Sequence, residues 1–171
     1  MSTALGAGTP LIIRDARAAD AAPIARWMIA MAWETEHKAL DPDIVARGVY
    51  AVFEQPARGR YFIAERNVDG AVVSVGVLML THEWSDWRDG DWWWIQSVYV
   101  QPASRRSGVY RALYGHVHAL AQATPDVCGL RLYVERDNAN AQRTYAALGM
   151  GDAGYAIFEE EFARENAEPA S

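Results

Sequence analysis

The stretch from Trp92 to Ala123, WWWIQSVYVQPASRRSGVYRALYGHVHALAQA, decides the fold that this sequence predicts. Residues 92–100 form an apolar run of strand length, and a short turn at 101–104 follows it. The chain then opens a segment in which apolar residues recur at helical spacing, at Val109, Leu113, Val117 and Leu120. The stretch therefore predicts a strand, a turn and a helix in direct succession.

The junction between this strand and this helix predicts an anion site. The first N–H groups of a helix have no intrahelical partner, and the helix dipole favours negative charge there. Gly108 allows a diphosphate to approach the backbone closely, and Arg105 and Arg106 add positive charge. An ordinary turn with two solvated arginines has the same local pattern, so the interpretation depends on a second segment.

That second segment is LRLYVERDNANAQRTYAALGM, from Leu130 to Met150. Residues 130–134 alternate between apolar and polar side chains, which predicts a strand. Asp137 or Asn138 then caps a short helix, and Gly149 ends it. Ala141, Tyr145 and Leu148 share one side of this helix.

Together the two segments resemble the GCN5-related N-acetyltransferase (GNAT) family. The family's pyrophosphate signature, Gln/Arg-x-x-Gly-x-Gly/Ala, falls on residues 105–110. Its second signature, Asn-x-x-Ala-x-x-x-Tyr-x-x-x-Gly followed by Phe or a similar residue, falls on Asn138, Ala141, Tyr145, Gly149 and Met150. Tyr110 stands where the family has Gly or Ala, which phosphate binding through backbone amides tolerates provided that the ring points away.

The resemblance implies an α/β (α+β) fold. Its mixed, mostly antiparallel central sheet is flanked by helices and splays apart at the acetyl-CoA site. The expected elements follow that order: strand 11–14, helices 21–32 and 43–53, a hairpin of 61–65 and 72–80 turning at Asp69-Gly70, strand 92–100, the helix after Gly108, strand 130–134, the short helix, and a final strand 155–162. Residues 33–38 and 81–91 are expected to be loops. We expect one N-acetyltransferase domain over 11–162, a disordered N-terminus (1–10) and a frayed tail (163–171).

Composition limits the class of protein. A chain of 171 residues that is 51% hydrophobic suits a single domain. The single Cys128 excludes an intramolecular disulfide, and we expect it to be a buried structural thiol in a reducing compartment. No membrane-spanning run or signal peptide is evident, so we expect a cytoplasmic protein. The net charge of −6 argues against a nucleic-acid partner and is compatible with a cationic acceptor.

The resemblance assigns the residues that bind acetyl-CoA. Val98, Tyr99 and Val100 would hold the pantetheine arm through main-chain groups, as an added strand does. A backbone N–H near Val98 or Tyr99 would also stabilise the oxyanion. The diphosphate would lie on the loop made by Arg105, Arg106, Ser107, Gly108, Val109 and Tyr110. Asn138 is a further cofactor-binding candidate, and no metal site is expected.

Acyl transfer from a thioester to an amine also requires a proton for the departing thiolate. Tyr145 matches the family position that supplies it, and a phenol with a reference pKa of about 10 can donate without ionising near neutrality. Core packing is the alternative role for a tyrosine at this spacing.

The general base is less evident from the sequence. Many relatives carry an acid near the position of Gln96 or Ser97, and this chain has neither Asp nor Glu there. A base must then come from elsewhere, within hydrogen-bond reach directly or through water. Glu83 is the first candidate, and the others are His82, Glu34 and Glu36.

The acceptor site is expected beside an unusual group of tryptophans at 84, 87, 92, 93 and 94. Packing accounts for about half of such a group, since neighbouring side chains on a strand point to opposite faces. The others are candidates for cation–π contact with an amine. The candidate substrate-binding residues are Glu34, Trp84, Trp87 and Gln96.

The sequence thus predicts an acetyl-CoA-dependent N-acetyltransferase that acts on the primary amine of a small molecule in a ternary complex. Nucleic acid and membrane partners are not expected, and a homodimer is left open. Two alternatives remain: an acetyltransferase for protein or peptide amines, and a catalytically silent CoA-binding regulatory module.

Overall fold

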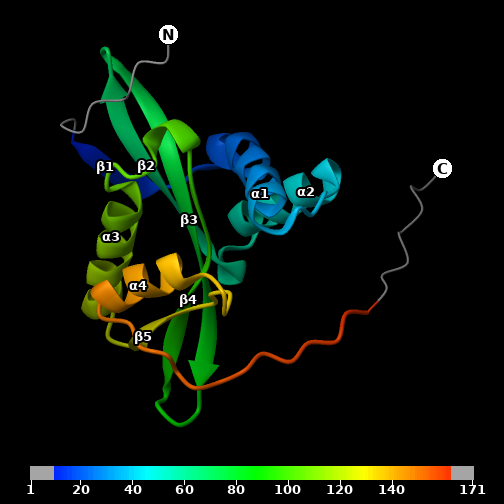
Figure 1. Cartoon of the computed structure of the whole chain (residues 1–171), viewed down its shortest axis with the longest axis vertical. Helices are drawn as coiled ribbons and strands as arrows, with labels where there is room; N and C mark the ends of the chain where they lie inside the picture. Colours follow the sequence, from blue (N-terminus) through cyan, green and yellow to red (C-terminus); the bar gives the residue numbers. More distant parts are fainter. Residues whose placement is uncertain (1–9, 163–171) are drawn as a thin grey trace. The chain divides into compact units, whose positions relative to one another are not determined.

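A computed structural model describes residues 10–162 of the protein (Figure 1). The chain divides into two compact units, Met1–Tyr133 and Val134–Ser171. The first unit holds a five-stranded sheet in the order β1-β2-β3-β4-β5. Strands β1 to β4 pair antiparallel, and β5 pairs parallel to β4. The predicted mixed, mostly antiparallel sheet with flanking helices is confirmed.

The elements of the first unit are β1 (Leu11–Asp15), η1 (Ala18–Asp20), α1 (Ala21–Glu36), α2 (Pro42–Glu54), η2 (Pro56–Arg58), β2 (Arg60–Val68), β3 (Ala71–Ser85), β4 (Gly90–Val100), η3 (Pro102–Ser104), α3 (Val109–Ala123) and β5 (Val127–Leu132). The second unit contains α4 (Ala139–Ala147).

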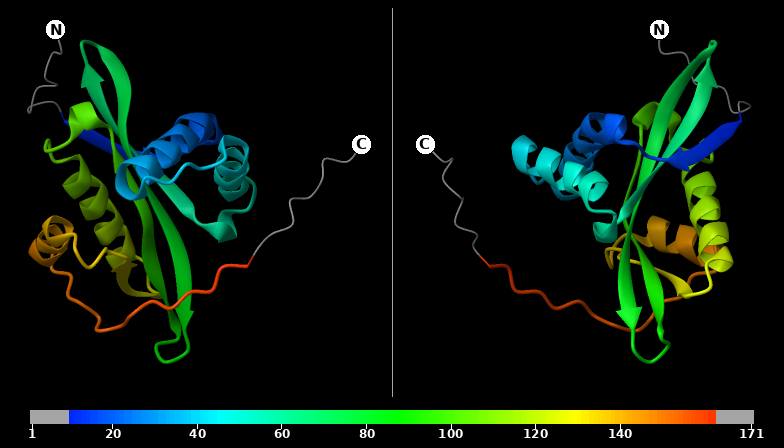
Figure 2. Two further views of the ribbon diagram at one scale, coloured as in Figure 1. Left: turned by 45° about the vertical axis from the view of Figure 1, so that its right-hand side comes forward. Right: turned by 180° about the vertical axis from the view of Figure 1, so that it is seen from behind.

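Helices cover both faces of the sheet in the first unit. Figure 2 shows α1 and α2 on one face and α3 on the other. The core under α1 and α2 contains Tyr61, Val77 and Tyr99 from the sheet. On the opposite face, a Cβ at Gly76 would lie 2.9 Å from Cγ1 of Val109. The glycine therefore allows the first turn of α3 to pack closely on β3.

The β2–β3 hairpin turns at Asp69-Gly70, as predicted. Both residues have positive φ, 52° and 86°, which suits a two-residue hairpin turn. The N–H of Gly70 also donates to Oδ1 of Asn67 at 2.9 Å. The strands extend well beyond the predicted ranges, because cross-strand pairing also holds the polar residues at both ends of the apolar runs.

Two expected loops are part of regular elements instead. Helix α1 continues to Glu36, where His37 ends it in a left-handed conformation (φ 53°). The side chains of its last turn are exposed and therefore do not continue the apolar pattern. A prediction from hydrophobic periodicity consequently placed the end of the helix at residue 32, which is too early. Similarly, β3 runs to Ser85 and β4 begins at Gly90, which leaves only a short turn of the expected 81–91 loop.

The predicted final strand over 155–162 is wrong. Residues 151–162 form neither helix nor strand, and the side chains of Tyr155 and Phe158 are 80% and 95% exposed. A strand requires a partner for its backbone groups, and none of the described residues pairs with this segment. Its apolar pattern is also broken, since Ile157 and Phe158 are adjacent and three glutamates follow.

The remaining predictions for the C-terminal half are largely confirmed. The fifth strand occupies 127–132 instead of 130–134. The prediction of a buried Cys128 is wrong, because its side chain is exposed; the residue lies at an irregularity in the pairing, which passes from Asp91 with Val127 to Trp92 with Gly129. In the second unit, the Asn138 side chain caps α4 by accepting from the Ala141 N–H at 3.0 Å. Gly149 (φ 90°) follows the helix end. Predictions for 1–9 and 163–171 lie outside the described residues.

Candidate active site

Strand β4 loses its β5 partner halfway along its length. The last parallel pair is Ile95 with Leu132, whereas β4 continues to Val100 as a partner of β3. A bulge lies at the same point, because Leu80 pairs with Ile95 while Met79 pairs with Ser97. Gln96 is therefore an extra residue that twists and redirects the strand. The sheet splays here, as predicted.

The second half of β4 presents backbone groups to the side that β5 has left. The N–H of Gln101 donates to the carbonyl of Val75 at 3.0 Å, which fixes one residue that faces β3. Alternate residues of an antiparallel ladder face opposite sides. The N–H and C=O groups of Val98 and Val100 consequently face away from β3. Among residues 10–162, no strand pairs with β4 on that side beyond Ile95.

The loop that follows β4 has the geometry of an anion site. Arg106 and Gly108 both have positive φ, 61° and 83°, and Gly108 is the N-cap of α3. Such turns direct successive N–H groups to one concave side. A Cβ at Gly108 would meet none of the described atoms within 4 Å, so the backbone is accessible there. The ring of Tyr110 stacks with that of Tyr114, one helical turn further along α3 (6.3 Å between centroids).

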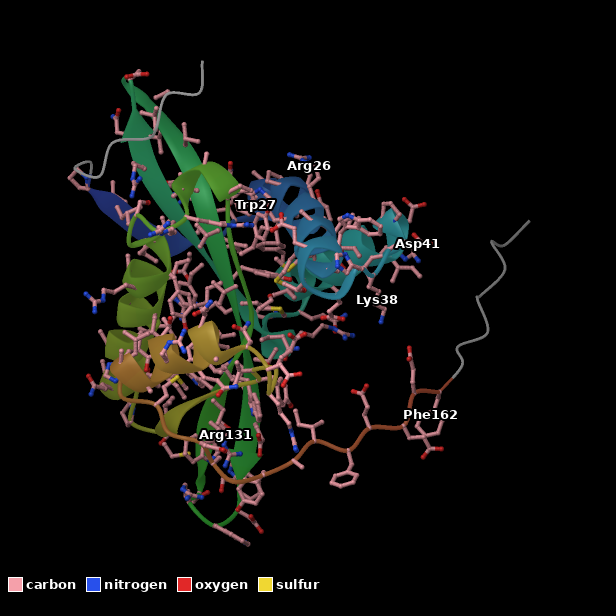
Figure 3. All side chains as sticks on the ribbon, viewed as in Figure 1. Arg26, Trp27, Lys38, Asp41, Arg131 and Phe162 are labelled. Carbon is pink, nitrogen blue, oxygen red and sulfur yellow. The ribbon has the colours of Figure 1, made fainter. Side chains whose placement is uncertain are left out.

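Arg105 is held by the protein itself. Its guanidinium donates to Oε2 of Glu34 on α1, and its Nε donates to the carbonyl of Val100 at 3.0 Å. Oε1 of Glu34 accepts from the hydroxyl of Tyr99 at 3.0 Å. Trp27 on α1, labelled in Figure 3, stacks on Tyr99 (6.3 Å between centroids). These contacts tie the end of α1 to β4 and to the loop at 105–108.

The environment of Glu34 keeps its carboxyl group ionised. The hydrogen bond from Arg105 is the largest influence and lowers the pKa of Glu34 below its ordinary value, and the bond from Tyr99 acts in the same direction. Burial, together with the neighbouring carboxylate, raises the pKa of the Tyr99 phenol. Glu34 therefore serves better as a fixed negative charge than as a proton acceptor.

The first candidate for the base, Glu83, is also engaged by neighbours on its own face of the sheet. Its Oε1 accepts from Arg131 at 2.9 Å and its Oε2 accepts from the indole N–H of Trp94. Arg131, labelled in Figure 3, lies 4.1 Å from the ring centroid of Trp92 and 5.9 Å from that of Trp94. The protein's own guanidinium thus covers two of the indoles considered for the acceptor.

The other tryptophans do not form one cluster. Trp84 neighbours Glu83 on β3, so its side chain points to the opposite face of the ribbon. Trp84 and Trp87 are 63% and 85% exposed, and Trp87 lies in the turn before β4. Trp93 is buried and contacts His82 edge-on. Among the four candidate acceptor residues, Trp84 and Trp87 lie toward the ribbon tip, Gln96 at the bulge and Glu34 on α1.

The two candidates of the second signature lie in the second unit. Asn138 uses its side-chain oxygen to cap α4, which leaves its amide group to other roles. Tyr145 lies on the half-buried side of α4 together with Ala141 and Leu148, as the helical spacing predicts.

The sequence did not predict one buried residue that contacts the loop at 105–108, Arg66. Arg66 on β2 is only 3% exposed, and its Nη2 donates to the carbonyl and the hydroxyl of Ser107. It shares a strand face with Phe62 and Ala64, both completely buried. This period of two was the available signal, although an arginine in a hairpin strand normally indicates the solvent face.

Comparison with protein families agrees with this geometry. The profile of the acetyltransferase (GNAT) family matches residues 22–150, which span parts of both units. The chain belongs to the GNAT acetyltransferase family. No curated protein matches the chain in sequence.

Solved structures show which GNAT proteins this one is similar to. A possible acetyltransferase from Clostridium difficile 630 has 38% sequence identity and a TM-score of 0.81, covering 90% of this chain and 99% of that chain. Two more distant structures share the fold. An aminoglycoside N-acetyltransferase in complex with CoA has 18% identity and a TM-score of 0.70 over 91% of this chain and 97% of that one. A ribosomal-protein-alanine N-acetyltransferase from Brucella melitensis biovar Abortus 2308 has 16% identity and a TM-score of 0.69 over 90% and 100%.

None of the helices in residues 10–162 combines the length and the apolar character that crossing a membrane requires. Within the same residues, no group of three or more His, Cys, Asp or Glu side chains could hold a metal ion.

The Glu34–Arg105 contact predicts a specific pH dependence of stability. Because the folded-state pKa of Glu34 is lowered from 4.5, its contribution is fully present above about pH 4.5 and is lost as the pH falls through the folded-state value. We expect Glu34→Gln to lower the urea midpoint near neutrality and to have progressively less effect between pH 5 and pH 3. Glu36→Gln, two residues further along α1, is the matched control. Equal midpoint differences at all pH values would contradict the assigned ion pair.

Proposed function

We propose that this GNAT protein transfers an acetyl group from acetyl-CoA to the primary amine of a small molecule, by direct attack in a ternary complex. One observation carries the proposal. A strand edge that β5 leaves unpaired leads directly into a loop with two positive-φ residues at the start of a helix. A thioester cofactor whose extended, amide-bearing arm is joined to a diphosphate needs both features, one for the arm and one for the charge.

The residues of β4 and the loop suit this cofactor. Val98 and the N–H of Val100 would bind pantetheine through the backbone, whereas the backbone groups of Tyr99 face β3 and the Val100 carbonyl accepts from Arg105. Residues 106–110 would bind the diphosphate. The accessible backbone at Gly108 supports the second assignment. Arg105 contributes through the loop's attachment to Glu34, because its guanidinium already has protein partners. When bound, acetyl-CoA supplies the activated acyl group.

The chain's own residues would complete the reaction. The backbone N–H of Val98, which faces away from β3, would donate to the developing oxyanion, whereas that of Tyr99 faces β3. Tyr145 would donate its phenolic proton to the departing thiolate, in keeping with its place in the family signature. The exposed half of the ribbon formed by β3 and β4 would receive the acceptor on the face that carries Glu83 and Gln96, whereas Trp84 lies on the opposite face.

Glu83 remains our candidate for the general base, with a condition that its contacts impose. A carboxylate bound by Arg131 and Trp94 must release one of them, or act through water, before it takes a proton from the amine. We prefer Glu83 to Glu34 because the Gln96 side chain accepts from the hydroxyl of Thr81, which lies two residues before Glu83 on the same face of β3.

The experiment that tests the function is thioester consumption with a panel of acceptors. Purified protein and acetyl-CoA would be incubated with aminoglycosides, polyamines and amino acids, and separately with peptides that begin with alanine. We expect turnover with at least one small amine and none with the peptides. Turnover of peptides alone would assign protein acetylation instead. Binding of acetyl-CoA without turnover of any acceptor would favour a catalytically silent CoA-binding module.

Replacing Tyr145 by Phe separates the proton-donor role from packing. The change removes only the hydroxyl, so we expect kcat to fall about 10²–10⁴-fold while the affinity for acetyl-CoA changes little. Tyr155→Phe, in the exposed C-terminal segment, is the control for loss of a tyrosine hydroxyl. Steady-state kinetics and calorimetry would measure the two effects. Near-normal kcat in a folded Tyr145→Phe protein would leave Tyr145 a packing residue.

Replacing Glu83 by Gln tests the base. We expect kcat/KM for the amine to fall about 10²-fold or more, with acetyl-CoA affinity unchanged and the acid limb of the pH–rate profile altered. Arg131→Gln breaks the same ion pair but keeps the carboxylate, so it should cost far less. Equal losses in the two variants would assign the pair to the structure of the ribbon and remove Glu83 as the base.

A further inference from the structure

Beneath the loop at 105–108, which we propose binds the diphosphate, lies a buried arginine that forms no ion pair with an acidic side chain of residues 10–162. Arg66 is 3% exposed, and the ion pairs found among residues 10–162 do not include it. The transfer of a cation into a protein interior is strongly unfavourable unless opposite charge and hydrogen bonds compensate it. An ordinary structural role in the sheet does not account for its burial.

The contacts of Arg66 point to the loop. Its Nη2 donates to the carbonyl of Ser107 at 3.2 Å and to the Ser107 hydroxyl at 3.1 Å. That hydroxyl in turn donates to the carbonyl of Ser104 at 2.7 Å. The Nε and Nη1 atoms of Arg66 are also buried and contact no hydrogen-bond acceptor among the described residues. The guanidinium therefore has N–H groups and a positive charge that the carbonyl and hydroxyl of Ser107 do not fully compensate.

The bond to the Ser107 carbonyl sets the direction of the next amide. In a trans peptide the C=O and the N–H point in opposite directions, and the chain has no cis peptide among its described residues. Since Arg66 draws the Ser107 carbonyl inward, the N–H of Gly108 is turned to the outer side. The positive φ values of Arg106 and Gly108 on either side of Ser107 belong to the same arrangement.

We propose that Arg66 is a positioning residue for diphosphate binding. It holds the Ser107–Gly108 peptide with its N–H directed outward, and it places a buried positive charge behind the loop. The inference rests on the proposed use of acetyl-CoA and adds a residue outside both signature segments. Because the charge is buried, water and salt screen it less than the exposed charge of Arg106.

The test compares two thioesters in one set of variants. Acetyl-CoA carries the diphosphate, and S-acetylpantetheine lacks it. We expect Arg66→Met to weaken acetyl-CoA binding about 10-fold or more and to leave binding of S-acetylpantetheine unchanged. The kcat at saturating acetyl-CoA should change little, since Arg66 is remote from the reacting atoms in this proposal. Arg66→Lys, which keeps the charge but not the planar fork, should retain part of the affinity.

Arg60→Met is the matched control, because Arg60 lies on the same strand, is exposed and pairs with Asp15. Circular dichroism would establish that each variant is folded. Normal acetyl-CoA affinity in folded Arg66→Met, or equal loss for both thioesters, would overturn the inference alone. Unfolding of Arg66→Lys as well as Arg66→Met would assign Arg66 to the fold and overturn it too. Absence of acetyl-CoA binding by the unaltered protein would instead overturn the proposed function, and this inference with it.

Discussion

The rest of the site depends on the hydrogen bonding of strand β4, which has strand partners on both sides in its first half and on one side in its second half. Up to Ile95 it pairs on both sides, and from Val98 to Val100 only β3 remains as its partner. The unpaired backbone groups would be costly if they were buried without partners. The bulge at Gln96 lies where the pairing with β5 ends, since β5 itself ends at Leu132, and an extra residue alters the local twist of β4. An extended ligand that adds as a strand would satisfy the same groups.

The charged residues around this strand form separate attachments. Arg105 and Glu34 connect the loop at 105–108 to α1, and Arg131 and Glu83 connect β5 to the ribbon of β3 and β4. Exposed ion pairs of this kind contribute little to stability, so their main effect here is on position. Each fixes a carboxylate that would otherwise be a candidate base. Arg66 differs from both, since it is buried and its partners are a carbonyl and a hydroxyl.

The errors of sequence interpretation share one cause. Hydrophobic periodicity detects faces that are buried, and it misses residues that pairing or a helix end keeps in regular structure while exposed. The last turn of α1 and the tip of the ribbon were therefore expected to be loops. The opposite error occurred at 155–162, where apolar residues in an approximate alternation predicted a strand without a partner. Arg66 was missed because the predicted strand ended at residue 65, whereas β2 continues to Val68.

The sequence by itself determined the order of the elements up to α4, the hairpin turn at Asp69-Gly70, the Gly108 turn before α3 and a polar cap at Asp137 or Asn138 for α4. These features depend on residues close together in the chain, whose φ preferences and local hydrogen bonds are set by residue type. Only the tertiary structure decided where the β4–β5 pairing ends, which carboxylates are bound by arginines, and that Arg66 lies under Ser107. These contacts join residues 41 to 71 positions apart or depend on strand register. No local pattern in the sequence specifies them, because they arise from packing of the whole sheet.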